Sequence, residues 1–143
     1  MAAHHHTVQI QIGRPVADVF AAVADPATHP QWQSQVIRTE TSDPAPLQVG
    51  ANVTDVIRMF GREMKMTFEV TESEPPDVIS IHMTSGPIRP INRMTFSSQD
   101  GGTLLQSETT IPGLMGRLMG RTVISGQKRN FQKLKELLEA GEL

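Results

Sequence analysis

The sequence predicts an α+β domain in which one strand and one or two short helices precede about six strands and a long C-terminal helix. Three observations predict this class: period-2 alternation of apolar residues in the strand regions, helical spacing of apolar residues in two segments, and Gly, Pro and Asp-Gly turn signals between them. A chain of 143 residues can bury a core without disulfides. We expect a single domain over residues 1–143, with residues 1–6 as a flexible tail.

The first elements follow from local patterns. Residues 7–12 alternate apolar and polar side chains, which is typical of a strand. Pro15 is well suited to the first turn of a helix, and apolar residues then recur at helical spacing over residues 16–24. Residues 28–33 have room for one more short helix, which carries Trp32.

The middle of the chain reads as an antiparallel meander. Gly61-Arg62 and Asp100-Gly101 are the expected turns of two hairpins. The strands are expected over residues 35–41, 52–60, 63–72, 78–85, 91–98 and 103–111. The last element is a helix over residues 114–140, followed by Gly141.

Register predicts which side chains share a face. A turn at Gly61-Arg62 places Met59 opposite Met64, and the Asp100-Gly101 turn places Arg93 opposite Glu108. One face of the first hairpin is then apolar except for Asp55, and it carries Val53, Ile57, Met59, Met64, Met66, Phe68 and Val70.

Several short strings, in this order and spacing, resemble the polyketide cyclase/dehydrase-like family of the START/SRPBCC superfamily, which includes the birch-pollen allergens. They are Gly13-Arg14-Pro15, Val19-Phe20, Val23-Ala24-Asp25-Pro26, Trp32, Val49-Gly50, Glu74-Pro75, Gly101-Gly102-Thr103 and Leu134-Lys135-Glu136-Leu137-Leu138. The resemblance implies a helix-grip fold, a curved antiparallel sheet of about seven strands around the C-terminal helix. It also implies a cavity for an apolar ligand between the sheet and that helix.

Eight methionines against six aromatic residues are the most unusual count in the composition. Methionine is unbranched and polarizable, so it fills irregular gaps and recurs at adaptable binding surfaces. The alternative is that these methionines only fill the core. We expect the ligand to contact Ile57, Met59, Met64, Met66, Phe68, Ile81, Met83, Asn92, Met94, Phe96, Leu105, Ser107, Met115 and Met119.

Asp55 is the best candidate for a catalytic or ligand-anchoring group, because a carboxylate on an apolar face is costly unless it is hydrogen-bonded or paired. The alternative is that Asp55 is hydrated near a sheet end or paired with a neighbouring polar group. Asn92, Ser107 and Thr109 share the inward face and are expected to form structural hydrogen bonds. His29 precedes a proline and is expected to cap or turn a loop.

Gly116 and Gly120 lie four residues apart near the start of the last helix. Each destabilises a helix by roughly 1 kcal/mol relative to Ala. They are consistent with close backbone approach, a frayed helix start or a flexible portal.

Composition also narrows the function classes. A net charge of −2 shows no basic footprint for nucleic acid, and the absence of cysteine excludes thiolate metal sites and cysteine nucleophiles. No run of about 18 apolar residues or signal-peptide pattern is present, so we expect no stable membrane insertion and a cytoplasmic location. No metal or cofactor is expected, and the protein is expected to be a monomer or homodimer. A short His4–His6 tract is not expected to form an ordered metal site.

Three functions remain open at this point. The leading hypothesis is binding of a small apolar, lipid-like or polyketide-like ligand. The second is a cyclase/dehydratase-type enzyme, a lyase or isomerase, that uses acid/base groups such as Asp55 in the same cavity. The third is a protein-interaction module.

Overall fold

A computed structural model describes residues 3–86 and 88–143. Along the chain the elements are β1 (Ala3–Ile12), α1 (Val16–Val23), the 3-10 turn η1 (Pro26–Thr28), α2 (His29–Trp32), β2 (Val36–Glu40), β3 (Asn52–Met59), β4 (Arg62–Glu74), β5 (Val78–Met83), β6 (Ile91–Gln99), β7 (Gly102–Pro112) and α3 (Gly113–Glu139). Their order confirms the predicted α+β class.

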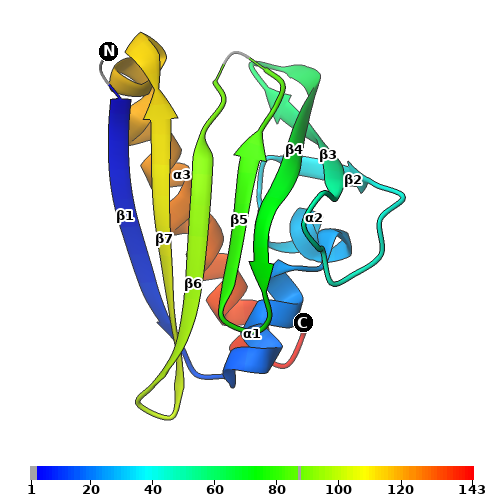
Figure 1. Cartoon of the computed structure of the whole chain (residues 1–143), viewed down its shortest axis with the longest axis vertical. Helices are drawn as coiled ribbons and strands as arrows, with labels where there is room; N and C mark the ends of the chain where they lie inside the picture. The colour runs from blue at the N-terminus through cyan, green and yellow to red at the C-terminus, as the bar shows by residue number, and fades with distance from the viewer. Residues whose placement is uncertain (1–2, 87) are drawn as a thin grey trace.

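All seven strands form one antiparallel sheet in the order β1-β7-β6-β5-β4-β3-β2. The sheet curves around α3, with α1 at its lower end and α2 beside β2 (Figure 1). Along the chain, both short helices lie between β1 and β2. This is the expected helix-grip fold. Within the described ranges, no helix has the length and apolar character needed to cross a membrane.

The N-terminal strand is longer than expected. β1 begins at Ala3, and its residues pair with β7 as far as Ala3 opposite Pro112. The prediction of a flexible tail is therefore wrong for residues 3–6; residues 1 and 2 lie outside the described chain. The reason is that β7 offers a long free edge, and His5 adds a hydrogen bond between its Nδ1 and Thr110 Oγ1 at 3.0 Å.

The β3–β4 hairpin turns one residue earlier than the sequence analysis expected. Phe60 and Gly61 occupy the turn with φ of +53° and +73°, so Met59 pairs with Arg62 rather than with Met64. A two-residue turn of this kind needs positive φ at both positions, and Gly61 supplies the second one without strain. The pairing shifts by two residues, so every side chain keeps its predicted face.

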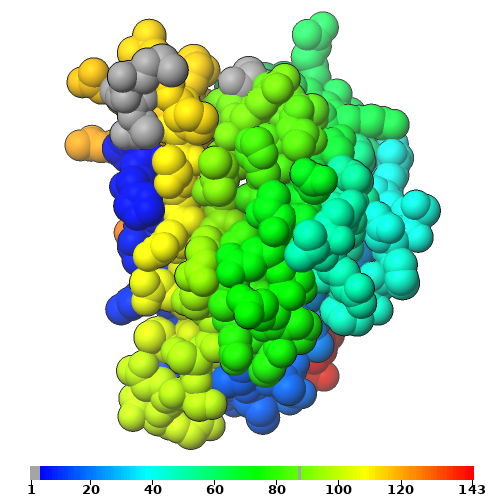
Figure 2. Space-filling model, viewed as in Figure 1, coloured from blue at the N-terminus to red at the C-terminus, as the bar shows by residue number. Residues whose placement is uncertain are grey.

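The β6–β7 hairpin has the expected register, with Gln99 opposite Gly102 and Arg93 opposite Glu108. Arg93 nevertheless forms its ion pair with Glu72 of β4, at 3.0 Å, instead of with Glu108. Both hairpins reach beyond the body of the molecule: β3–β4 at the top of Figure 2 and β6–β7 at the bottom. The two turns therefore mark opposite ends of the sheet.

The tightly packed core occupies the end of the molecule where α1 meets the second half of α3. Phe20 of α1 and Phe96 of β6 meet edge to face with ring centroids 5.1 Å apart. Leu134 and Leu138 of α3 are fully buried against the same cluster. This packing holds α3 rigidly at its C-terminal half and leaves its first turns beside the opposite, upper end of the sheet (Figure 1).

Candidate functional site

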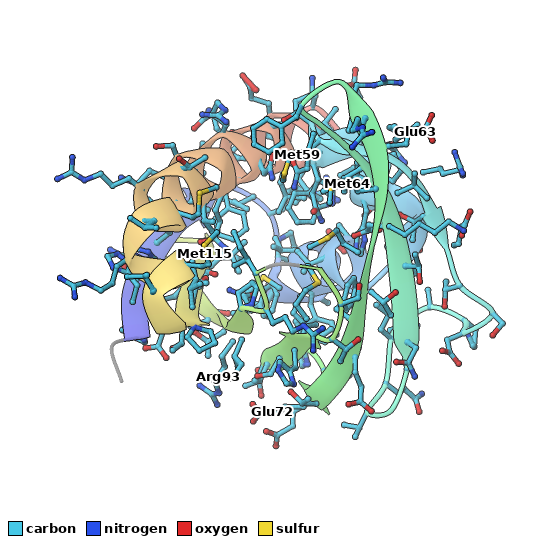
Figure 3. All side chains as sticks on the ribbon, turned by 90° about the horizontal axis from the view of Figure 1, so that it is seen from above. Met59, Glu63, Met64, Glu72, Arg93 and Met115 are labelled. Carbon is cyan, nitrogen blue, oxygen red and sulfur yellow. The ribbon has the colours of Figure 1, made fainter. Side chains whose placement is uncertain are left out.

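Six methionines gather around the upper end of the space between the sheet and α3. This group, called here the methionine end, consists of Met59, Met64, Met66, Met83, Met115 and Met119. Figure 3 looks down on this end and shows Met59 and Met64, from the β3–β4 hairpin, across the interior from Met115 on α3. The ion pair Arg93–Glu72 lies on the outer side of the sheet in the same view. The interior here is therefore surrounded by thioethers contributed by both layers.

Burial divides the predicted ligand-contact residues into two groups. The deeper ones are buried, and they are Ile57, Phe68, Asn92, Met94, Phe96, Leu105 and Ser107. The remaining residues are only partly covered by the rest of the protein: Met59, Met64, Met66, Ile81, Met83 and Met119 are half-buried, and Met115 is 40% exposed. The structure thus places the flexible side chains where the interior approaches solvent.

Two surface hollows lie away from this set. One, of about 490 Å³, is lined by Ala17, Phe20, Ala21, Asp25, Ala45, Pro46, Pro75 and Pro76. The other, of about 310 Å³, lies between β1 and α3 and is lined by Thr7, Val8, Gln9, Ile10, Lys128, Phe131 and Gln132. Neither hollow includes a predicted ligand-contact residue.

Asp55 is buried on the inner face of β3, as the register predicts, and it is paired. Its Oδ1 accepts a hydrogen bond from Thr39 Oγ1 at 2.7 Å and lies 3.3 Å from His29 Nδ1. Asp55 is 7% exposed and His29 is 4% exposed. The carboxylate is thus compensated by polar groups from two neighbouring elements, one of which is an imidazole.

The His29 ring is enclosed mainly by aromatic side chains. Trp32 packs edge-on against it with centroids 6.1 Å apart, and Phe68 of β4 lies at 6.0 Å. Trp32 in turn donates from Nε1 to Thr28 Oγ1 at 3.1 Å and faces Phe131 of α3 at 6.3 Å. The short helix α2 is therefore anchored between the sheet and α3, with its histidine turned toward the carboxylate.

A second polar cluster lies on the inner face of β6 and β7. Asn92 Nδ2 donates to Ser107 Oγ at 2.7 Å and to Thr109 Oγ1 at 2.9 Å, and all three residues are buried. Gln127 of α3 approaches the same Thr109 hydroxyl at 3.5 Å. These contacts agree with the structural hydrogen bonding expected for the three inward-facing residues.

His4 and His6 lie on the inner face of β1 against α3. Their rings are 3.8 Å apart, and a side chain added at Gly120 would meet both of them within 3.0 Å. His6 Nε2 is buried without a hydrogen-bond partner. Burial, reinforced by His4 and His5, lowers the pKa of His6 below the ordinary 6.5. No group of three or more His, Cys, Asp or Glu side chains is placed to hold a metal ion in residues 3–86 and 88–143.

The glycines at the start of α3 allow close approach of the backbone. A Cβ at Gly116 would lie 2.2 Å from the carbonyl oxygen of Ile111, and Gly120 lies against the His4 ring. The structure therefore supports the close-approach interpretation of these two residues. Gly126 differs, because only the Arg129 side chain comes within 4 Å, at 3.8 Å.

Large apolar side chains are exposed at the methionine end. They are Phe60 at the β3–β4 turn, Ile91 at the start of β6, and Leu114 and Leu118 in the first turns of α3. Arg117 and Arg121 are exposed on the same turns of α3. The exposed side chains that α3 contributes to this rim are thus apolar and basic.

The sequence analysis missed His29, Thr39 and His6 as members of buried polar groups. His29 was expected to cap or turn a loop, yet it lies inside the molecule beside Asp55. The signal that pointed toward it was the unpaired carboxylate predicted on the apolar face, which required a partner. Nothing local in residues 28–33 showed that this partner is a histidine.

Comparison with known proteins gives a consistent assignment. The profile of the family described as "Polyketide cyclase / dehydrase and lipid transport" matches residues 3–139. The uncharacterised protein Rv0088 of Mycobacterium tuberculosis is 31% identical over 71 residues, a match that covers 49% of this chain and 32% of that protein.

Solved structures share the fold at low sequence identity. Ara h 8.0201 superposes with a TM-score of 0.81 at 10% identity, covering 97% of this chain and 99% of its own. A START superfamily protein from Mycobacterium smegmatis superposes with a TM-score of 0.74 at 15% identity, covering 94% and 99%. At these identities the similarities show that the chain shares their fold.

Proposed function

Because the chain belongs to the polyketide cyclase/dehydrase and lipid transport family, we propose that it binds a small apolar, lipid-like or polyketide-like molecule between the sheet and α3. The ligand enters at the methionine end, where half-buried methionines of the sheet face Met115 and Met119 of α3. This arrangement of flexible apolar side chains on both walls is the observation that carries the proposal.

Methionine side chains suit this role because each has three rotatable bonds and no branch. Rotation of Met59, Met64 and Met83 opens space without moving the backbone of the sheet. A ligand that loses about 200 Å² of apolar surface to such a site gains roughly 5 kcal/mol before the costs of ordering. Only the surplus of this gain over the cost of ordering the ligand and the methionine side chains appears as affinity, so a larger buried apolar area gives tighter binding.

The first experiment is native mass spectrometry of the purified protein, followed by titration with the apolar fluorophore N-phenyl-1-naphthylamine. We expect co-purified apolar ligand or saturable binding of the fluorophore with a raised melting temperature. Met64→Gln introduces an amide at the methionine end and is expected to weaken binding about tenfold, because the amide must lose its water. Lys65→Gln introduces the same amide on the opposite face of the same strand and serves as the matched control. Equal affinity in both variants, or no binding in the wild type, contradicts the proposal.

A second candidate function is acid/base chemistry of the cyclase/dehydratase type in the same space. It is favoured by the buried contact between His29 and Asp55, since a histidine beside a carboxylate is a common acid/base arrangement. The test is exchange of the α-hydrogens of 2-tetralone for deuterium in heavy water. In this step a base takes the α-proton to leave the enolate, and a deuteron from solvent then adds to the same carbon and restores the ketone. Acceleration that disappears in Asp55→Asn supports the enzyme; a background rate in the wild type contradicts it.

The partner, location and oligomeric state proposed here follow from the same features. We infer a cytoplasmic protein that acts as a monomer or homodimer on a small ligand, without nucleic acid. Support comes from the net charge of −2 and the absence of cysteine. Sedimentation analysis of the ligand-free protein checks the oligomeric state.

The alternative function, a protein-interaction module, would instead use the exposed rim of Phe60, Leu114 and Leu118 as a protein contact.

A further inference from the structure

Two surface features lie outside the proposed ligand site. One is the tip of the β3–β4 hairpin, Phe60, Gly61 and Arg62, called here the hairpin tip. The other is the hollow of about 490 Å³ beside α1, called here the α1 hollow. We propose that these two features bind each other between two copies of this chain, so that Phe60 of one molecule enters the α1 hollow of another. This inference goes beyond the proposed function and does not depend on it.

Phe60 is placed in a way that the stability of the hairpin does not explain. Its φ of +53° is a backbone conformation that glycine and asparagine adopt more readily than a bulky residue does. Its side chain is 86% exposed, the highest value among the exposed large apolar residues of the described chain. A strained backbone conformation that the fold does not require points to a function for the residue that adopts it. For an exposed aromatic ring, that function is a contact that covers it.

The α1 hollow offers an apolar surface of a size that suits an aromatic ring. A cavity of roughly 150 Å³ is sufficient for benzene, so about 490 Å³ has room for a phenyl group and part of its turn. Ala17 and Ala21, one turn apart on α1, leave this space open because their side chains are short. Phe20 of the same helix and three prolines supply the rest of the apolar lining, which ends on Pro46, Pro75 and Pro76.

The surroundings of the α1 hollow are acidic. The segments that form it, residues 16–28, 42–48 and 73–78, contain no Lys or Arg. Their acidic residues are Asp18, Asp25, Asp43, Glu74 and Asp77. Asp18 is paired with Arg14 at 2.8 Å, whereas Asp25 itself lines the hollow. An apolar group that is accompanied by a cation therefore matches this hollow better than a neutral one.

The hairpin tip supplies that cation. Arg62 is exposed and forms no ion pair with any residue of 3–86 or 88–143. Glu63 beside it is the one acidic residue near the tip, and its carboxylate is 3.5 Å from the guanidinium of Arg38. Phe60 and Arg62 thus present an aromatic ring and an unpaired positive charge together, which is the combination that the α1 hollow complements.

The two features lie at opposite ends of the molecule, so the contact has to form between molecules. The β3–β4 turn is at the top of Figure 1 and α1 is at the bottom. Two molecules can exchange their tips in a closed pair, or a single contact can repeat from one molecule to the next. A tip of three residues is far smaller than the 20–30 residues per side of a standard interface, so we expect a dissociation constant on the order of 100 µM.

Sedimentation velocity of the whole chain, from about 10 µM to about 1 mM, tests the contact. The average mass of the wild type is expected to rise with concentration. Phe60→Asn is expected to weaken this association at least about tenfold, because it removes the aromatic anchor. Asparagine suits the turn, so the variant is expected to stay folded. Leu114→Asn makes the same kind of change at another exposed residue of the same end and is the matched control, which is expected to associate like the wild type.

The α1 hollow is tested by Ala21→Lys, which fills the space and places a second cation against Arg62. Ala21 is exposed and lysine is a good helix former, so the helix is expected to be retained. Ala27→Lys adds the same charge at an exposed residue outside the lining and is the matched control. Phe60→Asn and Ala21→Lys are each expected to be mainly monomeric alone. Their equimolar mixture is expected to associate, because one variant keeps an intact hollow and the other an intact tip.

Several results overturn the contact. They are a wild type that stays monomeric, unchanged association in Phe60→Asn or Ala21→Lys, and a mixture of these variants that does not associate. Equal weakening by Leu114→Asn would assign the association to the whole exposed rim and not to the hairpin tip. If Phe60→Asn keeps the association but loses binding to vesicles of phosphatidylcholine and phosphatidylglycerol, the tip is a lipid contact instead. Binding of N-phenyl-1-naphthylamine is measured separately, so none of these results decides the proposed function.

Discussion

Replacement of two glycines in α3 by alanine tests how firmly the first turns of this helix are held. In an unconstrained helix interior, Gly→Ala stabilises by roughly 1 kcal/mol, because glycine loses more backbone freedom on folding. At Gly126 the added Cβ meets only the Arg129 guanidinium, at 3.8 Å, which is ordinary contact. Gly126→Ala is therefore expected to raise the free energy of unfolding by about 1 kcal/mol.

Gly116 gives the opposite expectation from the same substitution. Its added Cβ would lie 2.2 Å from the Ile111 carbonyl oxygen and 3.0 Å from the carbonyl carbon, and both atoms are backbone. Ile111 is fully buried and cannot move aside easily. Overpacking of this kind costs about 1–3 kcal/mol, which offsets the helix gain and gives a net loss of about 1 kcal/mol.

Urea denaturation followed by circular dichroism at 25 °C measures both variants. The expected difference in unfolding free energy between Gly126→Ala and Gly116→Ala is about 2 kcal/mol, from the gain at one site and the loss at the other. If Gly116→Ala is as stable as Gly126→Ala, the start of α3 is not held against Ile111. The flexible-portal interpretation would then replace close approach.

Three further outcomes are expected. The folded-state pKa of His6 is lowered, so the free energy of unfolding falls as the pH drops below 6.5 toward that folded pKa. His6→Gln is expected to flatten this pH dependence in urea denaturation at pH 7.5 and 5.5. The same change in unfolding free energy between the two pH values in wild type and variant contradicts this expectation. Asn92→Ala leaves the buried Ser107 and Thr109 hydroxyls without their donor and lowers the unfolding free energy by about 1–3 kcal/mol, whereas an effect within 0.5 kcal/mol would show that water replaces the amide. Phe60 is 86% exposed and has a φ of +53°, a conformation that asparagine adopts with less strain than phenylalanine. Phe60→Asn is therefore expected to raise the free energy of unfolding by about 1 kcal/mol in thermal and urea denaturation. Unchanged stability refutes the turn strain.

The fold was predictable because its signals are local and repeated. Alternation along each strand defines an apolar face, and a shift of two residues in the β3–β4 pairing leaves that face unchanged. The Asp100-Gly101 turn has positive φ at both residues, so its register followed directly from the sequence. The Phe60-Gly61 turn was harder to locate, since bulky phenylalanine is an unusual residue at positive φ.

For the buried polar residues, the sequence predicted which face of the sheet they occupy but not all of their hydrogen-bond partners. Alternation placed Asp55, Asn92, Ser107 and Thr109 on the inner face, and hydrogen-bond satisfaction required partners for them. The partners of Asn92 lie on the adjacent strand, where register specifies neighbours. One partner of Asp55, His29, lies 26 residues away in the sequence, on a four-residue helix whose path depends on the tertiary packing of Trp32. Short helices of this length carry too little periodicity to show which side faces inward.

The distribution of aromatic and methionine residues explains why one end of the interior is closed and the other adaptable. Phe20, Phe68, Phe96, Phe131 and Trp32 are all at most 5% exposed and belong to the packed core, where stiff rings hold α1, α2 and the second half of α3 against the sheet. Six of the methionines lie beyond them as the methionine end, and Met94 is the one methionine of the described residues that belongs to the buried core.

This segregation confines the flexible side chains to one end of a fold that is otherwise tightly packed. The aromatic end fixes the backbone, so the ligand proposed above would have to displace only thioether side chains, whose rotation needs no backbone movement. His29 and Asp55 lie near the boundary between the two ends, where Phe68 contacts the imidazole ring and Met66 pairs with Asp55. The buried His29–Asp55 contact therefore lies where the stiff aromatic core gives way to flexible side chains. Position along the interior, rather than overall composition, is thus what separates this fixed polar contact from the adaptable apolar side chains.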